Sequence, residues 1–126
     1  MGFKNIKNLT PHVINLRGDF GKELIVEPSG IIARCEERIE PCEAIVLRHA
    51  INYERNERGN EFLNVPMIKK SLGEIKDLPE PIEGTIYITS LPVAQKAQRK
   101  DVFAIGESIR NEKGEVIGCK SLACFV

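Results

Sequence analysis

Short apolar runs separated by glycine and proline make up most of the hydrophobic pattern of this chain. In residues 31–36, Ile31, Ala33 and Cys35 alternate with Ile32, Arg34 and Glu36, which predicts a half-exposed strand. Residues 44–53 are rich in β-branched side chains and predict a further strand. Residues 62–75 contain a proline, which indicates an edge strand with a bulge, because proline cannot donate to a central ladder. The chain is therefore expected to consist mainly of strands.

Two hairpins are expected towards the ends of the chain. Residues 13–16 and 23–26 are apolar runs on either side of a glycine-containing turn. Residues 107–110 and 115–118 flank a four-residue tip that ends in glycine, which is a common hairpin connection. The last residues, 122–126, are apolar and are expected to join the sheet.

One short helix, residues 90–99, is expected after a strand at residues 84–89. Ser90 is a suitable N-cap, because its hydroxyl can accept a hydrogen bond from a free amide of the first turn. Pro92 falls in that turn, where a missing amide costs nothing. Many short strands and a single helix predict a β-rich α+β fold, a single domain over residues 1–126 with a mostly antiparallel curled or barrel-like sheet.

The charge balance argues against two classes of partner. Eighteen Lys and Arg residues offset eighteen Asp and Glu residues, so the formal net charge is zero. Proteins that bind nucleic acid or a membrane surface usually carry a basic excess. No stretch approaches the roughly 20 apolar residues of a membrane span, and the N-terminus lacks the apolar run of a signal peptide. We therefore expect a cytoplasmic protein, alone or as a homo-oligomer, without nucleic-acid or membrane partners.

The residue types that most often carry catalysis or hold metals lack the spacing of a known motif. The four cysteines form no C-x-x-C pair and are interpreted as free thiols, with a disulfide as the alternative. His12 and His49 are accompanied by no recognised nucleophile or cofactor motif. The sequence thus predicts no catalytic residue, no metal site and no cofactor, while a small hydrolase or transferase that uses either histidine remains an alternative.

A candidate anion site lies where the strand at residues 84–89 meets the helix. Free backbone amides and the helix dipole favour an anion at such a junction, and the hydroxyls of Thr89 and Ser90 lie beside those amides. Arg99 offers a fork of donors that suits phosphate, and Asp101 follows it. Capping also explains Ser90, and a solvated helix end also explains Arg99, so these interpretations remain beside the functional one.

A second polar group lies nearer the N-terminus. Ser29 and Arg34 are expected to line the same cleft as Ser90 and Arg99, and His12 is a further candidate for that cleft. The alternative for Ser29 is a role in the turn alone.

Four groups of residues along the chain, taken together, point to a resemblance. They are Asn8-Leu9-Thr10-Pro11-His12, Glu27-Pro28-Ser29-Gly30 with Ala33-Arg34, Leu78-Pro79-Glu80-Pro81 with residues 84–90, and Arg99-Lys100-Asp101-Val102. As a set they resemble a family of small proteins of bacteriophages, prophages and some bacteria that has no agreed activity. The resemblance spans nearly the whole chain and implies a phage-type accessory protein in the host cytoplasm. Such proteins often intercept a host molecule, including nucleotide-derived defence signals, without catalysis.

The sequence therefore favours a non-catalytic protein that binds a small anionic ligand such as a nucleotide. The residues expected to bind it are Ser90, Thr89, Arg99, Arg34, Ser29, His12 and Asp101. An alternative from another class is a module that binds a host protein through an edge strand or through the charged loop at residues 54–60.

Overall fold

The structure, a computed structural model, falls into two compact units. It describes residues 4–51 and 59–126, with the backbone alone at residues 49–51 and 59–61. The units are a body (Met1–Glu36 and Leu72–Val126) and a ribbon (Glu37–Ser71). No helix in the described part of the chain has the length and apolarity needed to cross a membrane.

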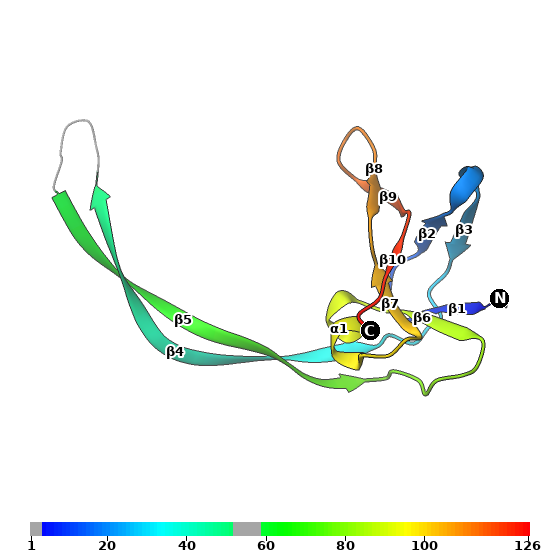
Figure 1. Cartoon of the computed structure of the whole chain (residues 1–126), viewed down its shortest axis with the longest axis horizontal. Helices are drawn as coiled ribbons and strands as arrows, with labels where there is room; N and C mark the ends of the chain where they lie inside the picture. Colours follow the sequence, from blue (N-terminus) through cyan, green and yellow to red (C-terminus); the bar gives the residue numbers. More distant parts are fainter. Residues whose placement is uncertain (1–3, 52–58) are drawn as a thin grey trace. The chain divides into compact units, whose positions relative to one another are not determined.

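The first sheet of the body is built around a central parallel strand (Figure 1). Its order is β1-β6-β7-β10, with β1 (Asn5–Asn8), β6 (Thr85–Ile88), β7 (Val102–Ile105) and β10 (Leu122–Ala123). β6 runs parallel to both neighbours, and β10 runs antiparallel to β7. Because parallel strands are covered on both faces, the burial of β6 does not alternate, and the consecutive residues Tyr87 and Ile88 are both fully buried.

A short helix, α1 (Leu91–Ala97), connects the parallel strands β6 and β7. Ala94 of this helix packs on β7 in a buried apolar cluster. Ser90 is the N-cap with an extended backbone, and Pro92 lies in the first turn, so the predicted position of the helix is confirmed. The Ser90 hydroxyl, however, makes no capping hydrogen bond, and that part of the prediction is wrong. The extended Ser90 backbone is enough to start the helix, so its hydroxyl stays available.

The second sheet of the body joins the two predicted hairpins. Its order is β3-β2-β9-β8, with β2 (Ile14–Arg17), β3 (Glu23–Val26), β8 (Ser108–Arg110) and β9 (Val116–Cys119). β2 with β3 and β8 with β9 are antiparallel pairs, as the turn residues predicted. A short 3-10 turn, η1 (Asp19–Gly21), connects β2 to β3. The two hairpins meet through a parallel pairing of β2 with β9.

The ribbon is part of a two-stranded sheet of long strands, β4 (Arg34–Ile51) and β5 (Gly59–Lys76), which run in opposite directions and twist about each other (Figure 1). The sequence predicted two strands between residues 31 and 53, but the structure has one. A proline at position 41 does not end β4, because each strand of a two-stranded sheet is an edge strand. Of the predicted loop at residues 54–60, the first five residues lie outside the described part of the chain, and the last two begin β5.

The fold class is confirmed as β-rich α+β, with one short α-helix among the described residues. The sheets are open and combine parallel with antiparallel pairs. Three buried apolar clusters hold the body together, and one of them joins Leu9, Ala33 and Val93 to Tyr87. This cluster brings the end of β1, the start of β4 and the helix side by side, and a candidate site lies where they meet.

Candidate functional site

A buried asparagine shapes the turn that forms one wall of this site. The Asn8 side chain is fully buried, and its Oδ1 accepts hydrogen bonds from the Thr10 amide at 2.9 Å and the Thr10 hydroxyl at 2.7 Å. Its Nδ2 donates to the carbonyls of His12 at 2.6 Å and Val26 at 3.2 Å. One side chain therefore satisfies three groups of the turn and the carbonyl at the end of β3, which holds the turn in place.

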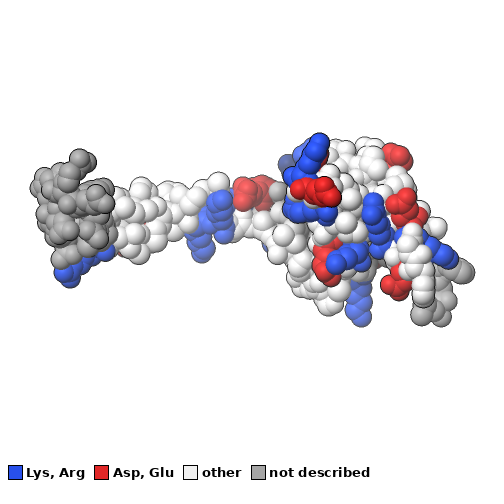
Figure 2. All heavy atoms as spheres, turned by 90° about the horizontal axis from the view of Figure 1, so that it is seen from above, with Lys and Arg blue, Asp and Glu red and all other residues white. Residues whose placement is uncertain are grey.

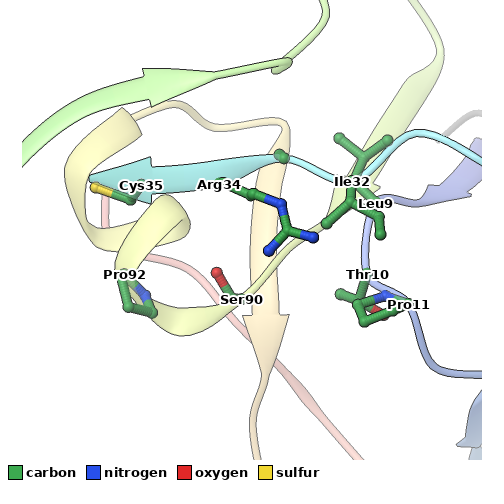
Figure 3. Close-up of a pocket in the computed structure, with 9 residues that line it drawn as sticks. Leu9, Thr10, Pro11, Ile32, Arg34, Cys35, Ser90 and Pro92 are labelled. Atoms are coloured by element: carbon green, nitrogen blue, oxygen red, sulfur yellow. The ribbon is translucent and has the colours of Figure 1, made fainter. Parts of the chain in front are cut away.

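A cavity of ≈ 220 Å³ separates this turn from the N-terminus of α1. Arg34, the first residue of β4, extends into the space between Thr10 and Ser90 (Figure 3). Its side chain is exposed and has no hydrogen bond or ion pair within the described residues. The other residues of the lining are Leu9, Pro11, Ile32, Ala33, Cys35 and Pro92. Arg34 is therefore an uncommitted positive charge at a concave surface.

A larger cavity of ≈ 660 Å³ lies on the other side of Thr10, Pro11 and Ser90, which line both. Thr89 and His12 contribute to its polar part. The rest of the lining is apolar: Val13, Ile14, Leu91, Ala104, Ile105 and Val116. Four of these, Val13, Leu91, Ile105 and Val116, are between 41% and 54% exposed, so this hollow presents large apolar side chains to solvent.

The two hydroxyls at the junction differ in their availability. Thr89 is 2% exposed, and its hydroxyl donates to the Ser90 carbonyl at 3.0 Å. The Ser90 hydroxyl has no partner among the described residues, and Ser90 lines both cavities. Ser90 is thus a free donor or acceptor near Arg34, whereas Thr89 mainly holds the chain in place.

Arg99 and Asp101 form a closed pair that lines neither cavity. The Arg99 guanidinium donates to both Asp101 carboxylate oxygens, at 2.9 and 2.6 Å, and to the Pro79 carbonyl at 3.0 Å. It also lies 5.9 Å from the centre of the Tyr87 ring. The hydrogen bond from Arg99 lowers the pKa of Asp101, and the same bond raises the pKa of Arg99, with burial opposing both shifts. All the donor nitrogens of Arg99 have partners, and its geometry is that of a structural clamp on the connector around Pro79.

Ser29, His12 and His49 each have a different relation to the two cavities. Ser29 lies in a turn, where its hydroxyl and the backbone of Ile31 approach within 3.3–3.4 Å, and it lines neither cavity. His12 lines the larger cavity. The side chain of His49 lies outside the described part of the chain.

The structure thus brings together four of the seven residues that the sequence singled out: Ser90, Thr89, Arg34 and His12. Sequence reasoning missed Asn8 as the organiser of the turn, although Asn two positions before Thr-Pro is a signal for a side-chain-stabilised turn. It also missed the apolar wall, because nothing local distinguishes Leu91 or Ile105 from a core residue. Among the described residues, no cluster of three or more His, Cys, Asp or Glu side chains is placed to hold a metal.

Comparison of this chain with protein-family models, with curated proteins and with solved structures gave no match.

Proposed function

We propose that this protein is a non-catalytic binder of a small anionic ligand of nucleotide type, held in the two neighbouring cavities of the body. The observation that carries the proposal is the Arg34 guanidinium, which extends into the smaller cavity without a partner among the described residues.

The charge at Arg34 supports an anionic group on the ligand. A guanidinium presents several donors in a planar fork that matches phosphate or carboxylate oxygens. The Ser90 hydroxyl lines the same cavity and can add a further hydrogen bond. An anion that binds there gains charge-assisted hydrogen bonds without breaking an ion pair of Arg34 within the described residues.

The larger cavity supports a ligand with a second, apolar part. Its volume of ≈ 660 Å³ lies within the range of roughly 300–1,000 Å³ typical of small-molecule sites. Exposed apolar side chains such as Val13 and Leu91 offer a surface for a flat ring. A nucleotide combines a phosphate with a planar base, so it matches the charge on one side of Ser90 and the apolar wall on the other.

The resemblance to phage and prophage proteins supports the biological role within this proposal. A phage-type accessory protein that binds a nucleotide without turning it over would remove a host defence signal from circulation.

Thermal unfolding of the full-length chain in the presence of AMP, ADP and a cyclic dinucleotide tests the proposal, with adenosine as the uncharged comparison. A ligand at about 100 times its Kd stabilises the folded state by roughly 2.7 kcal/mol, which raises the Tm of a domain this size by several degrees. We expect at least one phosphate-bearing probe to raise the Tm and adenosine to have a much smaller effect.

Arg34→Ala is expected to abolish the shift, because it removes the proposed anion contact. The matched control is Lys96→Ala, which removes an exposed cation from α1 at a position outside both cavities and should retain the shift. The proposal is wrong if no phosphate-bearing probe stabilises the native chain, or if Arg34→Ala responds as the native chain does.

A further inference from the structure

The ribbon exposes more apolar side-chain surface than soluble monomeric proteins usually do. Of its described side chains, all but Val65 are exposed. Eight large hydrophobic residues are between 41% and 71% exposed: Ile39, Ile45, Val46, Leu47, Phe62, Leu63, Met67 and Ile68. Figure 2 shows one stretch of the ribbon without charged residues, with blue and red spheres at either end of that stretch. An apolar patch of this size marks an interaction surface.

Both faces of the ribbon carry this apolar surface. Successive side chains of a strand point to opposite faces. Ile45, Val46 and Leu47 are consecutive on β4, and Met67 and Ile68 are consecutive on β5. Strands with such unbroken apolar runs are typically covered on both sides, and an isolated two-stranded hairpin is only marginally stable in water. The ribbon is therefore built for an assembled state.

The prolines indicate that a partner covers the faces of the ribbon and does not extend its edges. Pro41 lies on β4 and Pro66 on β5, and neither can donate a backbone hydrogen bond. In a two-stranded sheet, proline is tolerated where its nitrogen faces outward, so it interrupts the row of donors along the open edge. A continuous third strand would lose a hydrogen bond at each proline, whereas packing against the faces is unaffected.

Four charged residues of the ribbon fit another copy of this chain as the partner. Glu40 and Glu43 lie on β4, whereas Lys69 and Lys70 lie on β5, and none of the four has an ion-pair partner within the described residues. Glu40 and Glu43 point to opposite faces, as do Lys69 and Lys70, so each face carries one acidic residue on β4 and one basic residue on β5. When two ribbons pack face to face with the β4 of one copy across the β5 of the other, the acidic residue of each covered face meets the basic residue of the other. A formal net charge of zero adds no long-range repulsion between copies.

The exposed area is also of the size that self-association needs. A fully exposed large hydrophobic residue offers on the order of 200 Å². At their exposures, the eight residues together present on the order of 800 Å² over the two faces. A stable interface buries about that area on each partner, so copies that cover both faces reach the area that is needed.

We propose that the ribbon is the self-association interface of this protein, and that its apolar faces are covered by the ribbons of other copies of the chain. The inference is independent of the proposed ligand, because the ribbon residues that carry it line neither cavity of the body. Most soluble oligomers are assemblies of identical chains, which is the arrangement expected here.

Sedimentation velocity and native mass spectrometry of the full-length chain over a range of concentrations test this interface. We expect the native chain to be a dimer or larger, and Val46→Glu to weaken association at least 100-fold, because Val46 is 62% exposed in a single copy and becomes buried between copies. The control is Ile82→Glu, which places the same charge at a 53% exposed position of the body and should leave association unchanged.

A charge exchange separates self-association from other partners and does not depend on the folding of Val46→Glu. Lys69→Glu with Lys70→Glu should weaken association, and so should Glu40→Lys with Glu43→Lys. An equimolar mixture of the two double variants should associate as the native chain does, because opposite charges face each other again. The proposal is overturned if the native chain stays monomeric at all concentrations, if the mixture does not recover association, or if the monomeric chain instead binds phosphatidylcholine vesicles.

Discussion

Asn8 shows how one polar side chain can decide the shape of a site at the scale of a residue. It is fully buried, yet it has no charge and no apolar surface to gain from burial. Its four hydrogen bonds link the Thr10–Pro11–His12 turn to the carbonyl of Val26, which ends β3. The position of Asn8 two residues before Thr10-Pro11 indicates the turn. The hydrogen bond to Val26 spans 18 residues, however, and is visible only in the structure.

Asn8→Ala is expected to lower the free energy of unfolding by about 2–4 kcal/mol, because it leaves buried backbone groups without partners. Urea unfolding monitored by circular dichroism measures the change. Asn15→Ala is the matched control, since Asn15 is less buried and its amide donates to an exposed Glu23 carboxylate at 3.2 Å. A similar loss in both variants would contradict the role assigned to Asn8.

The Arg99–Asp101 pair leads to a pH dependence of stability. The pKa of Asp101 is lower in the folded chain than its ordinary value, chiefly because of the hydrogen bond from Arg99. The stability that this pair contributes is therefore fully present above the unfolded pKa of about 3.9 and is lost as the pH falls through the folded pKa.

Asp101→Asn should accordingly destabilise the chain by about 1–2 kcal/mol at pH 7, and the difference from the native chain should shrink as the pH falls below 4. Urea unfolding at a series of pH values measures this difference. Glu107→Gln is the control, because the Glu107–Lys120 pair is mostly exposed and contributes little. A penalty for Asp101→Asn that does not vary with pH would show that the ion pair is not its cause.

At the scale of elements, turns and the position of the helix were more predictable than strand lengths. The hairpins β2–β3 and β8–β9 follow from local turn signals, and the start of α1 follows from Ser90 and Pro92, although the Ser90 hydroxyl does not make the predicted capping bond. Local signals do not predict that the two expected strands merge into β4, because a proline ends a strand in some sheets and is tolerated at the edge of others. The partners of a strand decide which of these occurs.

At the corner between β7 and β8, a side chain larger than that of glycine does not fit. The Gly106 amide donates to the Ser121 carbonyl at 2.9 Å, and a Cβ at Gly106 would lie 2.4 Å from the Ser121 hydroxyl oxygen and 3.1 Å from that carbonyl oxygen. Gly106→Ala is therefore expected to cost about 1–3 kcal/mol in thermal or urea unfolding.

Gly18→Ala is the matched control for this corner. A Cβ at Gly18 has its nearest neighbour at 4.0 Å, and the backbone there has a φ of −96°, which alanine adopts readily. Gly18→Ala should be neutral or slightly stabilising. If Gly106→Ala is equally harmless, the corner is able to open and the steric argument fails.

At the scale of the whole molecule, the decisive pairings join distant parts of the chain. β1 pairs in parallel with β6, and β2 pairs in parallel with β9, across most of the sequence. No local pattern specifies such partners, which is why a mostly antiparallel sheet was the natural expectation. The same long-range packing places Arg34 near Ser90 and ties Arg99 to Asp101, so two arginines that look alike in the sequence differ in availability.

By itself, the sequence determined the β-rich class, the one short helix among the described residues, the two hairpins and the residues at the helix junction. These features depend on side-chain periodicity and turn chemistry over a few residues, and such signals are local in the sequence. Only the tertiary structure decided which hydroxyl is free, which arginine is paired and where the apolar wall of the cavity lies. It also decided how much apolar surface of the ribbon is exposed. Each of those depends on distances between segments far apart in the chain, and such distances are set by packing.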